Sequence, residues 1–312
     1  MTRLTREARE RAAAHLRGAA RPLERALYAH RFENGPAAAA VEALAAYRNE
    51  DGGFGRALEP DVRAPGSSAL ATADALRHLA ALGCAADHHL VAGAAVWLRQ
   101  AFDAEAGVWR VVSDDANDHP HAPWWHDEDG GLAKLFDGFR IIPRARVLAT
   151  LLHYAGLVEA DWLDAETRRA ADDILAAGDA AFGGGGDALV YALDLARAPG
   201  LPADLAARLV ERLRAAAAAV VERDPEKWGG YAAAPLKVVD GPDSPLAGLF
   251  AESLPANLDH LVAGQAGDGA WDPNWSWGGA FPEAWELARR EWRGVLTLDA
   301  LTTLRAFDRL ED

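Results

Sequence analysis

The chain has 312 residues, 50% of them hydrophobic and 25% charged, which excludes a disordered chain and is ordinary for a folded protein. Its 47 acidic and 32 basic residues give a formal net charge of −15, which argues against nucleic-acid binding through a basic face. The single cysteine, Cys84, excludes an internal disulfide and any metal site that needs two thiolates from one chain.

Alanine, leucine, arginine and glutamate fill long windows of the sequence, where apolar residues recur at three- and four-residue spacing. These residues have high helix propensities, so the pattern predicts a largely helical chain. Only short pieces, such as Val108–Val112, have the pattern of a strand. The predicted helices are, in chain order, Arg6–Arg17, Pro22–Arg31, Pro36–Arg48, Ser67–Leu82, His88–Phe102, Arg144–Gly156, Asp161–Ala177, Asp187–Ala196, Ala203–Glu222, Pro255–Gly264, Pro282–Trp292 and Val295–Leu310.

The sequence has no Ser/Gly-rich or Pro-rich linker, so we predict one all-α domain over residues 1–312, with residues 1–35 as an N-terminal helical extension. No uninterrupted apolar run approaches the roughly 20 residues that span a bilayer, so we expect no integral membrane segment. The N-terminal stretch MTRLTREARERAAAHLRG is charged from its start and lacks the apolar region of a signal peptide. We therefore expect a cytoplasmic protein.

A short motif recurs five times after predicted helices, in which an acidic residue leads into glycine and an aromatic residue. Glycine permits the left-handed backbone that reverses the chain after a helix. We expect the aromatic ring to cover apolar helix ends and the acid to cap amides at a neighbouring helix N-terminus. Such units cannot bury their apolar faces alone, so they must stack or close into a ring. The five copies are Asp51–Gly55, Glu105–Trp109, Asp179–Gly184, Glu226–Tyr231 and Asp268–Trp271.

Two of these copies carry a family resemblance. Arg48–Gly55 (RNEDGGFG) and Gly264–Trp271 (GQAGDGAW) resemble the Gln/Asp-Gly-aromatic repeats of squalene–hopene cyclases and protein prenyltransferase β subunits. Gly52–Asp61 also resembles bacterial proteins loosely labelled prenyltransferase-like. The resemblance runs from about Pro36 to the C-terminus and implies an α/α toroid, with inner and outer rings of about five helical hairpins around an apolar cavity for an isoprenoid chain.

The sequence departs from both enzyme groups at their catalytic motifs. It has no Asp-X-Asp-Asp motif, whose middle acid protonates the substrate in the resembled cyclases. Cys84 lies between two predicted helices rather than at the position of the zinc ligand in protein prenyltransferases. The resemblance therefore implies the fold and the cavity, and assigns no catalytic residue.

The densest polar segment is Ser113–Gly130, which precedes a predicted helix. Asp114, Asp115 and Asp118 spell Asp-Asp-X-X-Asp, the pattern that holds Mg²⁺ and a diphosphate in other isoprenoid enzymes, because hard Mg²⁺ prefers carboxylate and phosphate oxygens. That motif needs a helix, and Pro120 and Pro123 argue against one here. In so acidic a chain the match also arises readily by chance.

Two histidines follow these aspartates. His119 and His121, with Asp118 beside them, have the ligand types of a Zn²⁺ site, which we consider less favoured than Mg²⁺. They are equally candidates for general acid–base catalysis, as are Asp115 and Asp118. The simplest alternative is a polar loop whose histidines bond to backbone carbonyls.

A second acidic segment precedes the predicted helix Ser67–Leu82. Glu59 and Asp61 lie two residues apart on an extended X-Pro segment, so their side chains can reach one site, and pairing would raise one pKa and supply a general acid. Arg63 follows as a substrate-binding candidate. The alternative is a salt bridge from these acids to Arg56 or Arg63.

Further side chains are candidates for lining the cavity, because aromatic faces contact apolar chains and sugars and stabilise cations. An alternative role for the paired tryptophans is to pin their loop to the helices. These candidates are Trp124, Trp125, Asp187, Tyr191, Trp275 and Trp277.

Three functions follow from these observations. The leading one is a terpene cyclase- or prenyltransferase-like protein that binds, and cyclises or transfers, an elongated apolar isoprenoid. The second is a carbohydrate-active α/α-barrel hydrolase or lyase, which shares acidic pairs and exposed tryptophans. The third is a small-molecule-binding protein without catalysis. A dry apolar wall favours the first, and a polar cleft with two carboxylates favours the second.

Overall fold

The computed structural model describes residues 2–311 and confirms the all-α class. Within these residues it has thirteen α-helices, short 3₁₀ turns and no strand, only isolated β-bridges. None of the described helices combines the length and apolar character that a membrane span needs. The helices are α1 (Arg6–Gly18), α2 (Pro22–Glu33), α3 (Ala37–Ala45), α4 (Ala69–Ala81), α5 (His89–Gln100), α6 (Gly131–Leu135), α7 (Arg144–His153), α8 (Ala160–Ala176), α9 (Asp187–Ala196), α10 (Ala203–Val220), α11 (Pro235–Val238), α12 (Leu254–Ala263) and α13 (Pro282–Ala306).

Most predicted helices are confirmed to within a few residues, and α9 begins and ends as predicted. One prediction is wrong: the two helices expected on either side of Gly294 form the single 25-residue helix α13. A β-carbon at Gly294 would lie 2.9 Å from the Cβ of Ala20, so this glycine serves close packing against the N-terminal segment. Burial there stabilises a helix that glycine alone would weaken.

The described chain divides into two compact units. The central unit comprises Leu44–Phe182 and Asp187–Ala216, and the terminal unit comprises the residues up to Ala43, Gly183–Gly186 and the residues from Ala217 onward. The single domain predicted from the sequence stays a prediction.

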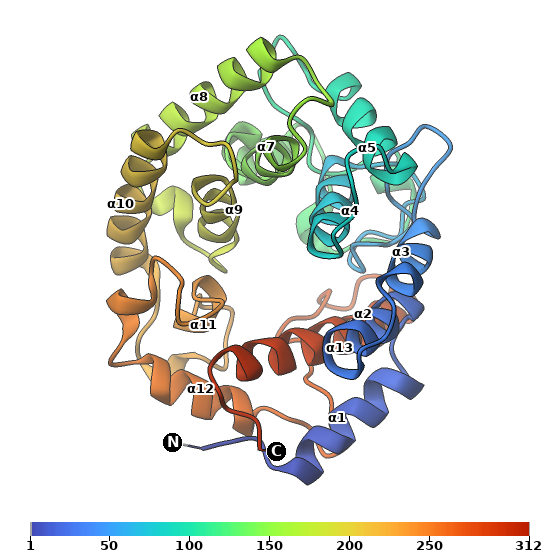
Figure 1. Ribbon diagram of the computed structural model, residues 1–312, viewed down its shortest axis with the longest axis vertical. Helices are drawn as coiled ribbons and strands as arrows, with labels where there is room; N and C mark the ends of the chain where they lie inside the picture. Colours follow the sequence, from blue (N-terminus) through green and yellow to red (C-terminus); the bar gives the residue numbers. More distant parts are fainter. Residues whose placement is uncertain (1, 312) are drawn as a thin grey trace. The chain divides into compact units, whose positions relative to one another are not determined.

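In the central unit, consecutive helices pair as hairpins (Figure 1). Helix α7 packs against both α4 and α9, so these three form a row, while α5 packs on α4 and α8 packs on α7. All the residues of α7 from Arg144 to Leu151 are buried, as expected for a helix with neighbours on several sides.

In the terminal unit, α13 packs against both α1 and α2, which also contact each other. The segment predicted as an N-terminal extension thus lies beside the last helix. Leu4 and Leu310 form a parallel β-bridge next to this group, in which the Leu4 amide donates to the Arg309 carbonyl at 2.7 Å. Helices α11 and α12 pack against each other elsewhere in this unit.

The recurring turns have a common structure. The first and last copies are nearly identical: the amides of Phe54 and Trp271 donate to threonine hydroxyls, Thr72 at 2.9 Å and Thr297 at 3.1 Å respectively. The five aromatic rings are buried, as predicted. They are Phe54, Trp109, Phe182, Trp228 and Trp271.

The acid of these turns has a different role from the predicted one. Asp51 accepts from the amide of Gly53 at 2.9 Å, and Asp268 accepts from that of Ala270 at 3.3 Å, two residues further on in its own turn. In these two copies the acid closes its own turn, because an aspartate reaches the amide two residues further on. Asp51 also accepts from the Ser67 hydroxyl at 2.8 Å and from Nε1 of Trp97 at 2.9 Å, which ties its turn to the start of α4 and to α5.

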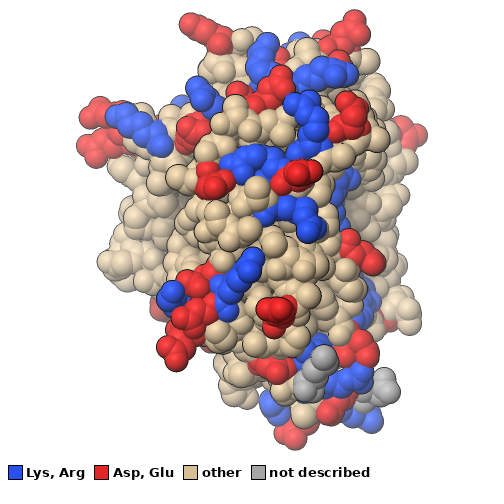
Figure 2. All heavy atoms as spheres, turned by 90° about the vertical axis from the view of Figure 1, so that its left-hand side faces the viewer, with Lys and Arg blue, Asp and Glu red and all other residues tan. Residues whose placement is uncertain are grey.

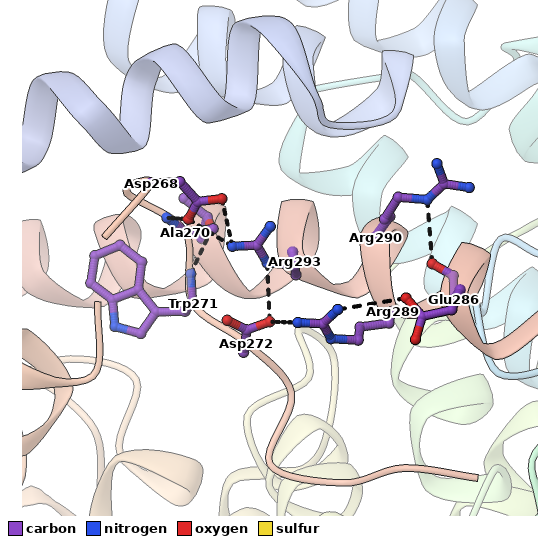
Figure 3. A network of polar contacts seen from close by, with 9 residues as sticks. Asp268, Ala270, Trp271, Asp272, Glu286, Arg289, Arg290 and Arg293 are labelled. Carbon is purple, nitrogen blue, oxygen red and sulfur yellow. Dashed lines mark hydrogen bonds and ion pairs between the residues drawn. The ribbon is translucent and has the colours of Figure 1, made fainter. Parts of the chain in front are cut away.

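The last turn is also tied to α13 by ion pairs (Figure 3). Asp268 accepts from Arg293 at 2.7 Å, and Asp272 pairs with Arg293 at 3.1 Å and with Arg289 at 3.0 Å. Hydrogen bonding to Arg293 lowers the pKa of Asp268. We assign this network a structural role, because its carboxylates are engaged by the arginines of one helix.

The surface carries both signs of charge. Figure 2 shows acidic and basic side chains interspersed on the face that it presents. We expect this mixing, because arginines are scattered among the more numerous acidic residues along the sequence.

Candidate functional site

One largely buried charged network of the central unit is centred on Arg146 of α7. Its Nε donates to Asp194 of α9 at 2.7 Å, and its Nη1 donates to Asp74 of α4 at 2.8 Å. The guanidinium carbon also lies 3.7 Å from the centroid of the Tyr191 ring. Arg146 is 8% exposed and Tyr191 7%, so one cation joins three helices inside the unit.

Two further carboxylates act on this network. Burial raises the pKa of Tyr191; Arg146 opposes the rise, and the charges of Asp74, Asp187 and Glu59 add to it. Asp187 stands one helical turn before Tyr191 on α9. We call Glu59, Asp74, Arg146, Asp187, Tyr191 and Asp194 the Arg146 cluster.

The charge state of the two central groups follows from these neighbours. Burial alone would lower the pKa of the Arg146 guanidinium, but Tyr191, Asp74 and Asp194 outweigh burial and raise it. Arg146 is therefore always a cation, and Tyr191 is a neutral hydroxyl at physiological pH. The four carboxylates of the cluster exceed its one arginine, so the cluster favours a ligand that offers hydrogen-bond donors or positive charge.

Local sequence explains how α9 contributes to the cluster. Asp187, Tyr191 and Asp194 stand at positions i, i+4 and i+7, which share one face of an α-helix. Asp194 retains 31% exposure of its side chain and Asp74 retains 19%, so the cluster is not sealed from solvent.

The neighbouring arginine of α7 serves a different contact. Arg144 pairs with Asp173 at 2.5 Å and with Glu166 at 3.7 Å, both on α8. Arg146 pairs with α4 and α9 instead. Arg144 therefore ties α7 to α8, its hairpin partner. Arg146 ties α7 to α4 and α9, its two neighbours in the row.

The two loops selected from the sequence lie side by side. Val62 and His121 form an antiparallel β-bridge, flanked by hydrogen bonds from the Arg63 amide to the Pro120 carbonyl at 3.0 Å and from the Ala122 amide to the Asp61 carbonyl at 2.9 Å. Asp61 is buried, at 2% exposure. The structure thus brings Glu59–Arg63 against the histidine segment, and the charge of Glu59 acts on Tyr191 of the Arg146 cluster.

A pair of histidine rings lies in the second loop. His121 and His126 stack with an interplanar angle of 4°, and Nε2 of His121 lies 3.1 Å from Nδ1 of His126. Nδ1 of His121 lies 2.6 Å from the His119 carbonyl, so this nitrogen is the donor and Nε2 of the neutral ring accepts from His126. His121 is buried and His126 exposed, an arrangement that can pass a proton between solvent and the loop interior.

The three aspartates of the predicted metal motif engage separate partners. Asp114 pairs with Arg110 at 2.6 Å and is largely exposed, whereas Asp115 accepts from the Gly66 amide at 3.2 Å and lies 3.8 Å from His119. Asp118 is exposed on a 3₁₀ turn rather than on an α-helix. In residues 2–311 no three His, Cys, Asp or Glu side chains are grouped to hold a metal ion. A Mg²⁺ or Zn²⁺ site here stays a prediction.

The tryptophan candidates fall in different places. Trp125 is buried and stacks on Phe136 at 5.2 Å, which pins the loop as the alternative interpretation expected, and Trp124 is half-buried. Trp275 and Trp277 belong to the terminal unit, where they pack on Trp292 and Trp285 of α13 respectively.

Sequence reasoning missed the three charged residues at the centre of the site. Asp74, Arg146 and Asp194 are isolated charges on the apolar faces of α4, α7 and α9. That isolation was an available signal, since a charged residue on a buried helix face needs a partner. The Arg146 cluster and the two paired loops together form the candidate site. Comparison of the chain with protein-family models, with curated proteins and with solved structures gave no match.

Proposed function

We propose that the chain folds as an α/α toroid in which α4, α7 and α9 belong to the inner ring and α5, α8 and α10 to the outer ring. The row α4–α7–α9, with α5 and α8 packed behind it, supports this arrangement. The recurring turns support it too, because repeated hairpins bury their apolar faces by stacking.

We propose further that the candidate site binds a polar, hydroxyl-rich small molecule and acts on it by general acid–base catalysis, as a carbohydrate-active hydrolase or lyase does. The observation that carries this proposal is the Arg146 cluster itself, where four carboxylates, a tyrosine and an arginine gather on helices expected to face the ligand. Carboxylates and neutral hydroxyls hydrogen-bond to sugar hydroxyls, whereas an isoprenoid chain needs an apolar wall.

Each group of the site has a role in this proposal. Glu59 and Asp187 are the acid–base pair of this proposal, because the charges of both act on Tyr191 and Asp187 stands one helical turn before it on α9. Tyr191 donates its proton in a hydrogen bond to the substrate, since its raised pKa keeps it neutral. Arg146 is a positioning residue that fixes Asp74 and Asp194.

The isoprenoid function remains the second candidate. The buried Trp125–Phe136 stack and the half-buried Trp124 favour it, because aromatic faces stabilise carbocations. In that case the same carboxylates supply the acid that starts the reaction.

A thermal-shift panel separates the two candidates. It contains oligosaccharides of glucose, xylose and N-acetylglucosamine, farnesol, and farnesyl diphosphate with and without Mg²⁺. We expect an oligosaccharide to raise the midpoint by several degrees, because a ligand at about 100 times its Kd stabilises by roughly 2.7 kcal/mol. A midpoint shift with farnesol or farnesyl diphosphate, and none with any oligosaccharide, would instead support the isoprenoid function. A farnesyl diphosphate shift that requires Mg²⁺ would show that the diphosphate binds together with the metal ion.

Matched variants connect any shift to the site. Glu59→Gln and Asp187→Asn preserve side-chain shape and should reduce the ligand-induced shift, because each removes one charged hydrogen-bond acceptor while the rest of the site remains. Asp114→Asn is the control, because this carboxylate lies on the adjoining loop, is exposed and pairs with Arg110. An equal shift in all three variants would refute the assignment of the site.

A further inference from the structure

A cavity of about 540 Å³ lies in the terminal unit and is lined by residues of α1, α2, α13 and the C-terminal segment. These three helices pack against one another (Figure 1). Its volume falls within the range of small-molecule sites and exceeds what an inorganic ion needs. Every residue that lines it belongs to this one unit, so it is separate from the Arg146 cluster of the central unit.

The cavity is lined by guanidinium groups held against aromatic rings. Tyr28 and Phe32 of α2 stack with ring centroids 5.2 Å apart. The guanidinium of Arg305 lies 4.1 Å from the centroid of Phe32, and that of Arg17 lies 5.8 Å from that of Tyr28. Stacking on a ring fixes the plane of a guanidinium, which prepares its N–H groups to bind a ligand.

Two arginines of the cavity lining, Arg9 and Arg305, use few of their N–H donors within the described residues. Arg9 donates from Nη1 to the Glu311 carbonyl at 2.7 Å, and Arg305 donates from Nη1 to the Arg31 carbonyl at 2.5 Å. Both acceptors are neutral, and no carboxylate pairs with either guanidinium in the described residues. Each guanidinium has five N–H donors in a planar fork, so several remain for an incoming group.

The acidic residues that line the cavity are bound by other partners. Glu33 pairs with Arg17, Asp308 with Arg3, and Glu10 with Arg6 at 3.1 Å. The carboxylate of Glu311 accepts from the Arg6 amide at 3.2 Å. Among residues 2–311, therefore, neither the Arg9 nor the Arg305 guanidinium forms an ion pair with a carboxylate.

We propose that this cavity binds a small organic oxyanion, a phosphate ester or a carboxylate, through the guanidinium groups of Arg9 and Arg305. The planar forks match the oxygen pairs of both groups, and the apolar side chains of the lining, Ala13, Phe32 and Leu310, contact the rest of the ligand.

Isothermal titration calorimetry with phenyl phosphate, benzoate and inorganic phosphate tests the proposal. We expect phenyl phosphate or benzoate to bind more tightly than inorganic phosphate, because only these probes bring an apolar body, and whichever of the two binds tighter identifies the ligand class. Affinity should fall with added salt. Absence of binding by all three probes at millimolar concentration would overturn the proposal.

Variants locate the binding. Arg9→Gln and Arg305→Gln should each weaken binding by about tenfold or more, because a charge-assisted hydrogen-bonded pair is lost. Arg290→Gln is the matched control, since Arg290 also lies on α13 and donates to a carbonyl, that of Glu286, and does not line the cavity. It should bind within about twofold of wild type.

Conservative variants distinguish weaker ligand binding from loss of folding. Arg9→Lys and Arg305→Lys keep the charge and remove the planar fork, so we expect weakened binding with an unchanged circular dichroism spectrum. Affinity equal to wild type in the Gln and Lys variants would overturn the proposal. Because the cavity and the Arg146 cluster share no residue, Glu59→Gln should leave phenyl phosphate binding unchanged, which keeps the two proposals separately testable.

Discussion

Arg146→Met should lower the free energy of unfolding by about 3 kcal/mol, because removing one partner of a buried ion pair leaves its carboxylates uncompensated. Arg146 is the only arginine bonded to both Asp74 and Asp194 in the described residues, and its own side chain is 10% exposed. The partial exposure of Asp194 places the expected loss near the low end of the range for buried pairs. Urea unfolding followed by circular dichroism measures it.

Two further variants serve as controls for Arg146→Met. Arg77→Met removes an arginine from α4 that lies 3.7 Å from Asp74 but is 52% exposed, and should cost less than about 1 kcal/mol. Adding Asp74→Asn and Asp194→Asn to Arg146→Met should recover most of the loss, since the two carboxylates that Arg146 binds are then neutral. If Arg146→Met were no more destabilising than Arg77→Met, the cluster would not hold α4, α7 and α9 together.

Trp109→Ala should lower the free energy of unfolding by roughly 3–5 kcal/mol, the usual cost of removing a buried large aromatic side chain. The ring has 0% exposure, contacts Phe102 with centroids 4.7 Å apart, and donates from Nε1 to the Leu98 carbonyl at 2.7 Å. Truncation leaves a cavity between the second recurring turn and α5. Chemical denaturation measures the loss.

A graded series separates packing from hydrogen bonding in this turn. Trp109→Phe keeps an aromatic ring and leaves the Leu98 carbonyl without its donor, so we expect an intermediate loss of about 1–3 kcal/mol. Val96→Ala on α5, whose side chain is exposed, should change stability by less than about 0.5 kcal/mol. A loss from Trp109→Ala as small as that of Val96→Ala would show that the aromatic residue of the turn is not structural.

The helices were predictable because their signals are local. Spacing of apolar residues located α4, α7 and α9. Ser68, just before α4, accepts from the Ala71 amide at 3.1 Å, the local hydrogen bond of a serine N-cap. The error at Gly294 shows where local signals fail: its helix-breaking tendency is overcome by packing against Ala20, a residue far away in sequence.

The candidate site was predictable only in part. Glu59, Asp187 and Tyr191 were found because each begins or precedes a predicted helix, where functional groups gather. Asp74 lies in the middle of α4 and Arg146 in the first turn of α7, and they become partners only when α4 packs on α7. No pattern within either helix specifies that pairing.

The paired loops illustrate the same limit. Sequence composition singled out both loops, and it could not show that Val62 would pair with His121. It also could not show that the His121 ring would lie beside the His126 ring, with Nε2 of His121 3.1 Å from Nδ1 of His126. Contacts of this kind depend on backbone hydrogen bonds between distant segments, which composition does not encode.

The central claim is that the Arg146 cluster is where this protein binds its substrate. A crystal structure of the Glu59→Gln variant, soaked at high concentration with the oligosaccharide that most stabilises the wild type, tests it most directly, because a catalytically impaired site retains an unreacted ligand that still meets Asp187 and Tyr191. We predict sugar density within hydrogen-bond distance of the Asp187 carboxylate and the Tyr191 hydroxyl. Density confined to another part of the molecule, with those two groups contacting only protein or water, would contradict the claim.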